Sequence, residues 1–341
     1  MKQRIEMKQR IEFIDLAKGI CISLVVLLHV YGDLSGTVIK IMNLFRMPLY
    51  FVLSGLFFKT YNGLYPFLKK KINKLIMPFL FTFFFVIIPT DVLLHLLSGT
   101  DITLYRLFWG GNGKVNLGIN GAAWFLLCLF FVNVYFYLIF LLTHHNIVGI
   151  TILSCLCGIL GYALNYYHIV LPMWFDSSLT AMPFFLMGYA MRCYSDILYG
   201  KMILREYASC ALSLIVLIGV YLFDEWQGKS VIAFGNNEFD ISIMSLYLGG
   251  FAGTYFVLMV SKYLQHVPCM SYIGRYSIVV LLSHLLYMFV FRNVMYQLGI
   301  PQESIILNLF VFIAIMLLEL PTIKFCIKYL PYCFAQKDLL R

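Results

Sequence analysis

Long apolar segments, bounded by polar residues or by Gly and Pro, recur along almost the whole chain. Most reach the roughly 20 residues that a helix needs to cross a bilayer. They lack the alternation of apolar and polar positions typical of membrane β-strands, and helices satisfy their own backbone hydrogen bonds in lipid. The pattern predicts an all-α polytopic membrane protein, a bundle of about ten transmembrane helices. The expected spans are 13–31, 44–60, 75–97, 121–142, 147–165, 178–195, 206–223, 241–263, 272–292 and 303–330.

Composition supports lipid as the solvent. Of the 341 residues, 62% are hydrophobic and 12% are charged, and the mean hydropathy is +0.86. Soluble domains carry about twice this charged fraction, and soluble monomers rarely expose large apolar patches. The nine cysteines are scattered in or beside spans. Neither a disulfide framework nor a zinc site is therefore predicted, and no metal is expected.

The distribution of Lys and Arg predicts the orientation. With the N-terminus inside, 18 of the 25 fall on the cytoplasmic side, five fall outside and two lie within spans. This asymmetry follows the positive-inside rule, and both termini are expected in the cytoplasm. Topology accounts for the net charge of +9, so no nucleic-acid partner is expected. The expected parts are a cytoplasmic N-terminal extension (1–12), one membrane domain (13–330) and a cytoplasmic tail (331–341).

The connecting segments carry two further hypotheses. The longest are assigned outside: 98–120, 166–177 and 224–240. They are either the mouth of a substrate site or plain connectors. Inside, the densest basic cluster follows the second span, and it binds either anionic lipid headgroups or a nucleotide-bearing cofactor. This basic cluster consists of Lys69, Lys70, Lys71 and Lys74.

The first span contains ionisable side chains, which are costly in a bilayer and are therefore candidates for function. Asp15 and Lys18 are three residues apart, so they share a helix face as a candidate ion pair. Lys18 and His29 are eleven apart, which is within about 20° of three helical turns and a rise of about 16 Å. The two thus line one face at different depths. Alternatively, Lys18 extends to the interface and His29 makes only an interhelical hydrogen bond.

Five stretches, in order, resemble the membrane acyltransferase-3 family, which includes O-acetyltransferases of bacterial surface sugars. They are RIEFIDLAKGICISLVVLLHV, FRMPLYFVLSGLFF, AAWFLLCLF, MPFFLMGYAMR and MSYIGRYSIVVLLSH. The resemblance covers nearly the whole chain. It implies a multi-pass protein of the bacterial cytoplasmic membrane that transfers an acyl group, usually acetyl from cytoplasmic acyl-CoA, to a sugar hydroxyl outside.

The resemblance also implies roles for the ionisable residues. His29 falls at the position of the catalytic base, a task suited to a neutral histidine near pH 7. Lys18 falls where the family usually carries arginine, which keeps the charge but loses bidentate geometry. With Asp15, it is expected at the cofactor site. Arg275 is expected to contact the phosphates of CoA or only to anchor its helix.

Other matched positions are expected near the acceptor. Arg46, at the outer start of the second span, falls where many relatives carry histidine, and it would bind the acceptor or a developing oxyanion. Trp124 would stack on a sugar, and His284 would support the site. As alternatives, Arg46 and Trp124 are interfacial anchors and His284 is a packed hydrogen-bonding group. Ser54 and Gly55 are expected to serve helix packing.

Two other classes of function stay open at this point. A transporter or flippase fits about ten spans by composition, although no internal repeat typical of many transporters is evident. A non-catalytic membrane subunit of glycan assembly is the other. The expected partners are membrane lipid and a carbohydrate or lipid-linked sugar. The sequence does not identify the acceptor, the acyl group, the oligomeric state or any second protein that completes the transfer.

Overall fold

The computed structural model describes residues 11–32, 36–99, 103, 108–109, 114–194, 202–301 and 304–340. Within these residues, nine helical segments are long and apolar enough to cross a membrane. The prediction of an all-α polytopic membrane protein is confirmed. The nine are α1 (Glu12–Tyr31), α2 (Thr37–Leu56), the continuous helix Leu64–Ser98, Gly121–Leu142 with α7 (Trp124–Leu142), α8 (Ile147–Tyr166), α11 (Leu204–Trp226), α12 (Ile243–Leu264), α14 (Ser277–Gln297) and α15 (Ile305–Tyr329).

Four of the remaining elements are short helices and two are strands. Helix α13 (Pro268–Arg275) precedes α14, and a hairpin of β1 (Ile232–Ala233) and β2 (Glu238–Phe239) lies between α11 and α12. The expected span 178–195 is interrupted: η4 (Pro172–Trp174), α9 (Phe175–Thr180) and α10 (Met182–Tyr194) replace it.

The break between α9 and α10 coincides with Pro183, which has no N–H to continue the helical hydrogen bonds of α9. At the second position of α10 the missing N–H needs no partner. Upstream of the expected span, Met173 and Trp174 have φ of 52° and 61°, a left-handed conformation that no continuous α-helix allows, so α9 begins only at Phe175. Residues 181, 182, 184 and 185 are fully buried, so α10 lies inside the bundle and packs against α2.

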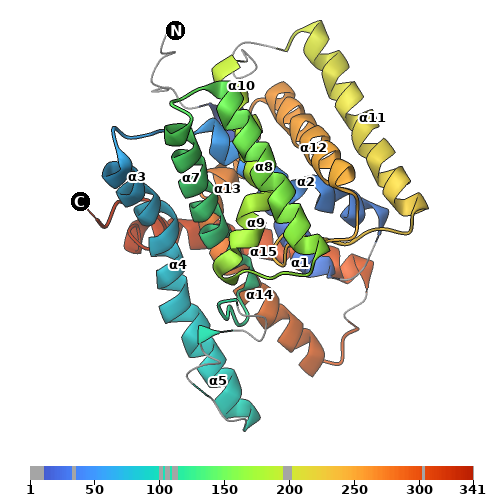
Figure 1. Ribbon diagram of the computed structural model, residues 1–341. Helices are drawn as coiled ribbons and strands as arrows, with labels where there is room; N and C mark the ends of the chain where they lie inside the picture. Colours follow the sequence, from blue (N-terminus) through green and yellow to red (C-terminus); the bar gives the residue numbers. More distant parts are fainter. Residues whose placement is uncertain are drawn as a thin grey trace.

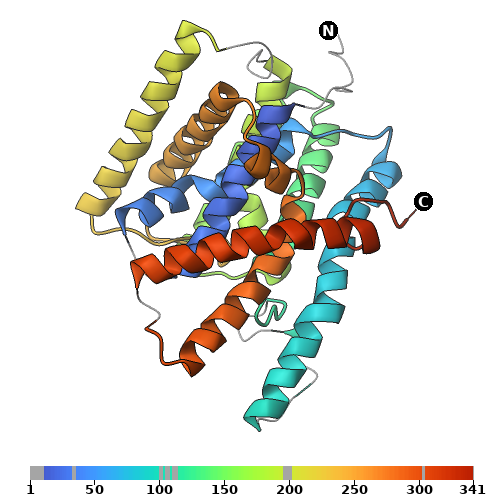
Figure 2. The same cartoon turned by 180° about the vertical axis from the view of Figure 1, so that it is seen from behind.

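Helix α1 forms the centre of the bundle. It contacts α2, α12, α13, α14 and α15, and Figure 2 shows α15 crossing it obliquely. Two glycines bring α1 and α13 together: a Cβ on Gly19 would lie 2.1 Å from the Met270 carbonyl oxygen, and one on Gly274 would lie 1.8 Å from that of Asp15. Such small residues allow helix backbones to approach closely in membranes. This contact sets Lys18 and Arg275 near one another.

Helix α2 differs from the expected span 44–60 because it begins at Thr37, after Gly36 as its N-cap. Arg46 therefore lies in the middle of the helix and not at its outer start. The polar Lys40 is accommodated in the first turn because it pairs with Glu225 of α11 at 2.8 Å. Gly55 packs as expected: a Cβ there would lie 2.0 Å from the Phe185 carbonyl oxygen of α10.

The helix Leu64–Ser98 stands at one edge of the molecule and α11 at the other (Figure 1). It joins α3 (Leu64–Lys71), α4 (Met77–Thr82) and α5 (Ile88–Ser98) through two π-helical turns, η1 (Ile72–Ile76) and η2 (Phe83–Ile87). The basic cluster thus lies within this helix and not in a loop.

The C-terminal segment folds back against the start of this long helix. Lys70 pairs with Asp338 at 2.6 Å, and Lys74 donates to the Ala335 carbonyl oxygen. The Asn73 side chain bonds the backbone of Leu339 and Leu340. Part of the basic cluster therefore already has a partner within the chain.

Candidate functional site

Two cavities meet inside the bundle. The first, here called the histidine cavity, has a volume of about 360 Å³ and is lined by His29, Arg46 and Trp124, among others. The second, the lysine cavity, has a volume of about 500 Å³ and is lined by Lys18 and Arg275, among others. Three side chains line both: Tyr50, Phe125 and Leu281. Lys18 and His29 of α1 thus face two adjoining cavities at different depths along the helix.

His29, in the wall of the histidine cavity, has a second histidine beside it. The rings of His29 (α1) and His284 (α14) have centroids 5.3 Å apart and are tilted by 40°. Nδ1 of His284 lies 2.7 Å from the Val280 carbonyl oxygen, which can only accept, so Nδ1 carries the proton. Nε2 of His284 is therefore an acceptor, and it is buried with no hydrogen-bond partner among the described residues. His284 thus offers a fixed acceptor beside the ring of His29.

Arg46 and Tyr50 lie one turn apart on α2, and both line the cavity. The Nε of Arg46 is buried and has no hydrogen-bond partner among the described residues. A guanidinium placed beside a histidine is suited to stabilising negative charge that develops during a reaction. The helical spacing of Tyr50 from Arg46 was available in the sequence, but its position between two cavities was not.

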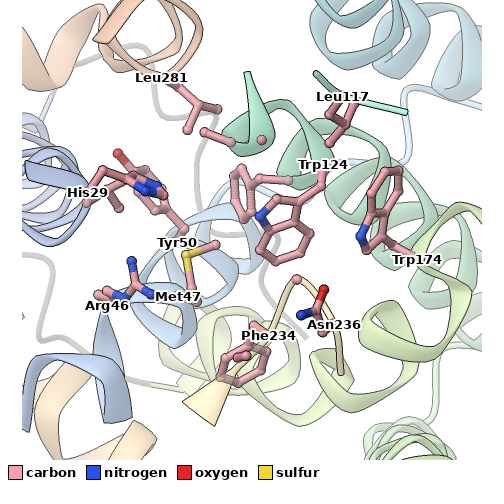
Figure 3. Close-up of a pocket in the computed structure, with 16 residues that line it drawn as sticks. His29, Arg46, Met47, Tyr50, Leu117, Trp124, Trp174, Phe234, Asn236 and Leu281 are labelled. Carbon is pink, nitrogen blue, oxygen red and sulfur yellow. The ribbon is translucent and has the colours of Figure 1, made fainter. Parts of the chain in front are cut away.

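Aromatic side chains form the opposite wall. Figure 3 shows His29 and Arg46 on one side of the cavity and Trp174 and Asn236 on the other, with Trp124 between them. The indole of Trp124 packs against Gly235, where a Cβ would lie 3.2 Å from the ring. Each of the three long loops supplies at least one lining residue: Leu117, Trp174, and 234–236 of the hairpin turn.

A buried ion pair supports this aromatic wall. Lys114 Nζ lies 3.5 Å from an Asp176 carboxylate oxygen and donates to the Gly235 carbonyl oxygen at 3.1 Å. It also lies 5.9 Å from the centroid of the Trp174 ring, within cation–π range. Burial lowers the pKa of Lys114, and the charge of Asp176 opposes that effect. One lysine therefore connects the loop of Trp174 to the hairpin turn.

The lysine cavity combines four cations with an apolar wall. The cations are Lys18, Lys71, Lys74 and Arg275. Lys18 Nζ lies 5.0 Å from the centroid of the Phe57 ring, and Arg275 lies 5.4 Å over Tyr276. The remaining wall is mostly aliphatic and aromatic, with Ser54 and Ser277 as polar exceptions. Such a site is suited to a ligand that has both anionic and apolar parts.

The structure distributes the seven residues singled out from the sequence as follows. His29, Arg46 and Trp124 line the histidine cavity, and His284 lies directly behind His29. Lys18 and Arg275 line the lysine cavity, Arg275 as the last residue of α13. Asp15 lies in the first turn of α1 and lines neither cavity.

Sequence reasoning missed Trp174, Gly235 and the ion pair of Lys114 with Asp176. Among the described residues, no group of three or more His, Cys, Asp or Glu side chains is placed to hold a metal ion.

The fold and the site define a multi-pass membrane protein with two adjoining cavities that share three lining side chains. A family model described as an acyltransferase domain, that of the acyltransferase-3 family, matches residues 11–323. The chain belongs to this family and is a membrane acyltransferase. No curated protein and no solved structure matches it.

Proposed function

We propose that this protein is an O-acyltransferase that moves an acyl group, with acetyl as the expected one, from acyl-CoA to a hydroxyl of a carbohydrate or glycolipid. The observation that carries the proposal is the meeting of the two cavities at Tyr50, Phe125 and Leu281. The cations of the lysine cavity suit an anionic donor, and the histidine and arginine of the other cavity suit the reaction with an acceptor hydroxyl. Donor and acceptor would therefore meet at the three shared side chains.

The lysine cavity is the proposed donor site. Its four cations match the phosphates of CoA, and its apolar wall matches a thioester-bearing arm. Lys18 and His29 are separated by a rise of about 16 Å along α1, and a pantetheine arm has a comparable reach. By the positive-inside rule this cavity faces the cytoplasm, and we place both termini there, in a bacterial cytoplasmic membrane, with the broken segment α9–α10 as a tenth crossing beside the nine long helices of the described residues.

The histidine cavity is the proposed site of chemistry. His29 takes the proton of the acceptor hydroxyl as its oxygen attacks the thioester carbonyl carbon. Arg46 stabilises the negative charge on the former carbonyl oxygen. As the carbon–sulfur bond breaks, the thiolate of CoA leaves and receives the proton from His29. The products are an ester and free CoA.

His284 and the aromatic wall have supporting roles in this proposal. Nε2 of His284 is buried without a partner among the described residues beside the ring of His29, and in this proposal the His29 ring turns to donate one N–H to it, which leaves the other His29 nitrogen unprotonated for the hydroxyl. Trp124 and Trp174 offer flat apolar surfaces for the C–H face of a sugar ring.

The test is transfer of labelled acetyl from acetyl-CoA to surface glycan by purified protein in nanodiscs. His29→Ala should reduce the rate about 10²- to 10⁴-fold, the usual contribution of a general base. His144→Ala is the matched control because His144 is exposed in the turn after α7 and should leave the rate unchanged. Undiminished transfer by His29→Ala would contradict the assignment.

A further inference from the structure

His29 lines a second opening besides the histidine cavity. A polar cleft of about 580 Å³ lies between the ends of α1 and α2 and is lined by His29, Lys40 and Asn43, among others. Lys40 pairs with Glu225, but exposed ion pairs contribute little stability, so a ligand can compete with Glu225 for Lys40. The Oδ1 of Asn43 is buried and accepts no hydrogen bond from the described residues. The cleft therefore offers hydrogen-bonding groups directly beside the proposed base.

An apolar groove of about 530 Å³ continues from this cleft. Ile39 lines both, and the groove runs between α1, α2 and α15 along Leu27, Met42, Ile305 and Leu309, among others. Several of its side chains are exposed, Val38 by 65% and Leu309 by 46%, so the groove is open to the lipid. The groove is apolar and open to lipid, and the cleft is polar and reaches His29. Together they suit an amphipathic molecule with its hydrocarbon chain in the groove and its polar part in the cleft.

We infer that the acceptor is a glycolipid, whose hydrocarbon chain lies in the groove lined by Val38 and Leu309 while its sugar reaches His29 through the cleft of Lys40 and Asn43. This inference rests on the proposed function, and it names the substrate class of the same site. The continuity of groove, cleft and histidine cavity through Ile39 and His29 distinguishes this occupant from ordinary bilayer lipid. A phospholipid would fill the apolar groove, and its phosphate would compete with Glu225 for Lys40, but a phosphodiester has no proton to donate to the Oδ1 of Asn43, whereas a sugar hydroxyl has.

Photolabelling in nanodiscs tests the inference without requiring turnover. The two probes are a monoglycosyl diacylglycerol and a phosphatidylglycerol that carry the same diazirine-bearing acyl chain, and peptide mass spectrometry locates the labels. We expect the glycolipid to label the groove peptides of α2 and α15 roughly tenfold more than the phospholipid does, which is the gain from one or two extra hydrogen bonds. Equal labelling by both probes would mean that ordinary lipid fills the groove, and it would overturn the inference.

Variants separate the groove from the rest of the lipid-facing surface. Leu309→Trp fills the groove and should abolish the preference for the glycolipid, whereas Leu317→Trp, on an exposed part of α15 outside the groove, should keep it. Asn43→Leu should reduce labelling by the glycolipid alone. Loss of the preference in Leu317→Trp, or its persistence in both Leu309→Trp and Asn43→Leu, would contradict the inference.

The proposed function fails by a different result. If wild-type protein shows the labelling preference but transfers no acetyl group to any glycolipid or glycan, the binding site stands and the acyltransferase assignment to this acceptor falls.

Discussion

The close contact of α1 with α13 can be tested by replacing Gly274 with alanine. The new Cβ would lie 1.8 Å from the carbonyl oxygen of Asp15, and real Cβ atoms essentially never approach within 3.0 Å. The distance between this Cβ and the Asp15 oxygen must therefore increase from 1.8 Å to at least 3.0 Å, so the two helices move apart by about 1.2 Å. Overpacking of this kind costs about 1–3 kcal/mol of stability. Because Lys18 follows Asp15 by one turn and Arg275 adjoins Gly274, the displacement also separates two cations of the lysine cavity.

Two measurements follow from this displacement. Thermal unfolding should show that Gly274→Ala is destabilised, and donor titration should show a raised KM for acetyl-CoA. Gly219→Ala is the matched control because no atom lies within 4 Å of its new Cβ. In a helix interior that change should stabilise by about 0.5–1 kcal/mol. If Gly274→Ala resembles Gly219→Ala in both stability and KM, the proposed link between helix contact and donor site is refuted.

Three further predictions concern polar groups away from the donor. His284→Gln should retain more kcat than His284→Phe, with donor KM unchanged in both, because only Gln keeps an acceptor beside His29; equal kcat values would refute this. The hydrogen bond from Lys70 lowers the pKa of Asp338, so the contact of the C-terminal segment with Lys70 should be complete above the ordinary pKa of about 3.9 and lost as pH falls through the lowered pKa. Hydrogen-exchange protection of the Leu339 amide should decrease over the same pH range. In Asp338→Asn this protection should be low at every pH. Glu319→Gln should leave thermal stability nearly unchanged, whereas Glu319→Ala should lower it.

Ser283 has one hydroxyl hydrogen but three acceptor oxygens within hydrogen-bond distance. The Ser283 hydroxyl lies 2.8 Å from the Val279 carbonyl oxygen and 2.7 and 2.8 Å from the two oxygens of Glu319. One hydroxyl hydrogen serves one acceptor well, so the arrangement is satisfied when Glu319 is protonated and donates to Ser283. A neutral Gln can make the same donation. A large loss of stability in Glu319→Gln would show that the group is charged.

What the sequence could predict here depends on local pattern. The helix-length apolar runs identify the spans because lipid forces each span to satisfy its own backbone. The separation of Lys18 from His29 along one face of α1 follows from helical geometry alone, and the structure places these residues in two adjoining cavities. Both inferences use residues within a single helix.

What the sequence could not predict depends on contacts between distant segments. Lys114 contacts Gly235 and Asp176 only after several helices have packed, and no spacing along the chain signals this. The start of α2 was placed too late because Lys40 resembles a residue outside the membrane, although Glu225 of another helix neutralises it. Lys114 and Lys40 are thus explained by partners more than 60 residues away.

The central claim is that the donor and the acceptor approach from opposite sides of the membrane and meet where the cavities join. Sealed proteoliposomes test it directly, with impermeant labelled acetyl-CoA in the bath and a glycolipid acceptor enclosed on the lumenal side, in the inner leaflet. The account predicts acetylation of the enclosed acceptor by molecules whose lysine cavity faces the bath, and a marked loss of it in Lys18→Ala. Acetylation only of acceptor added to the same side as acetyl-CoA would contradict the account.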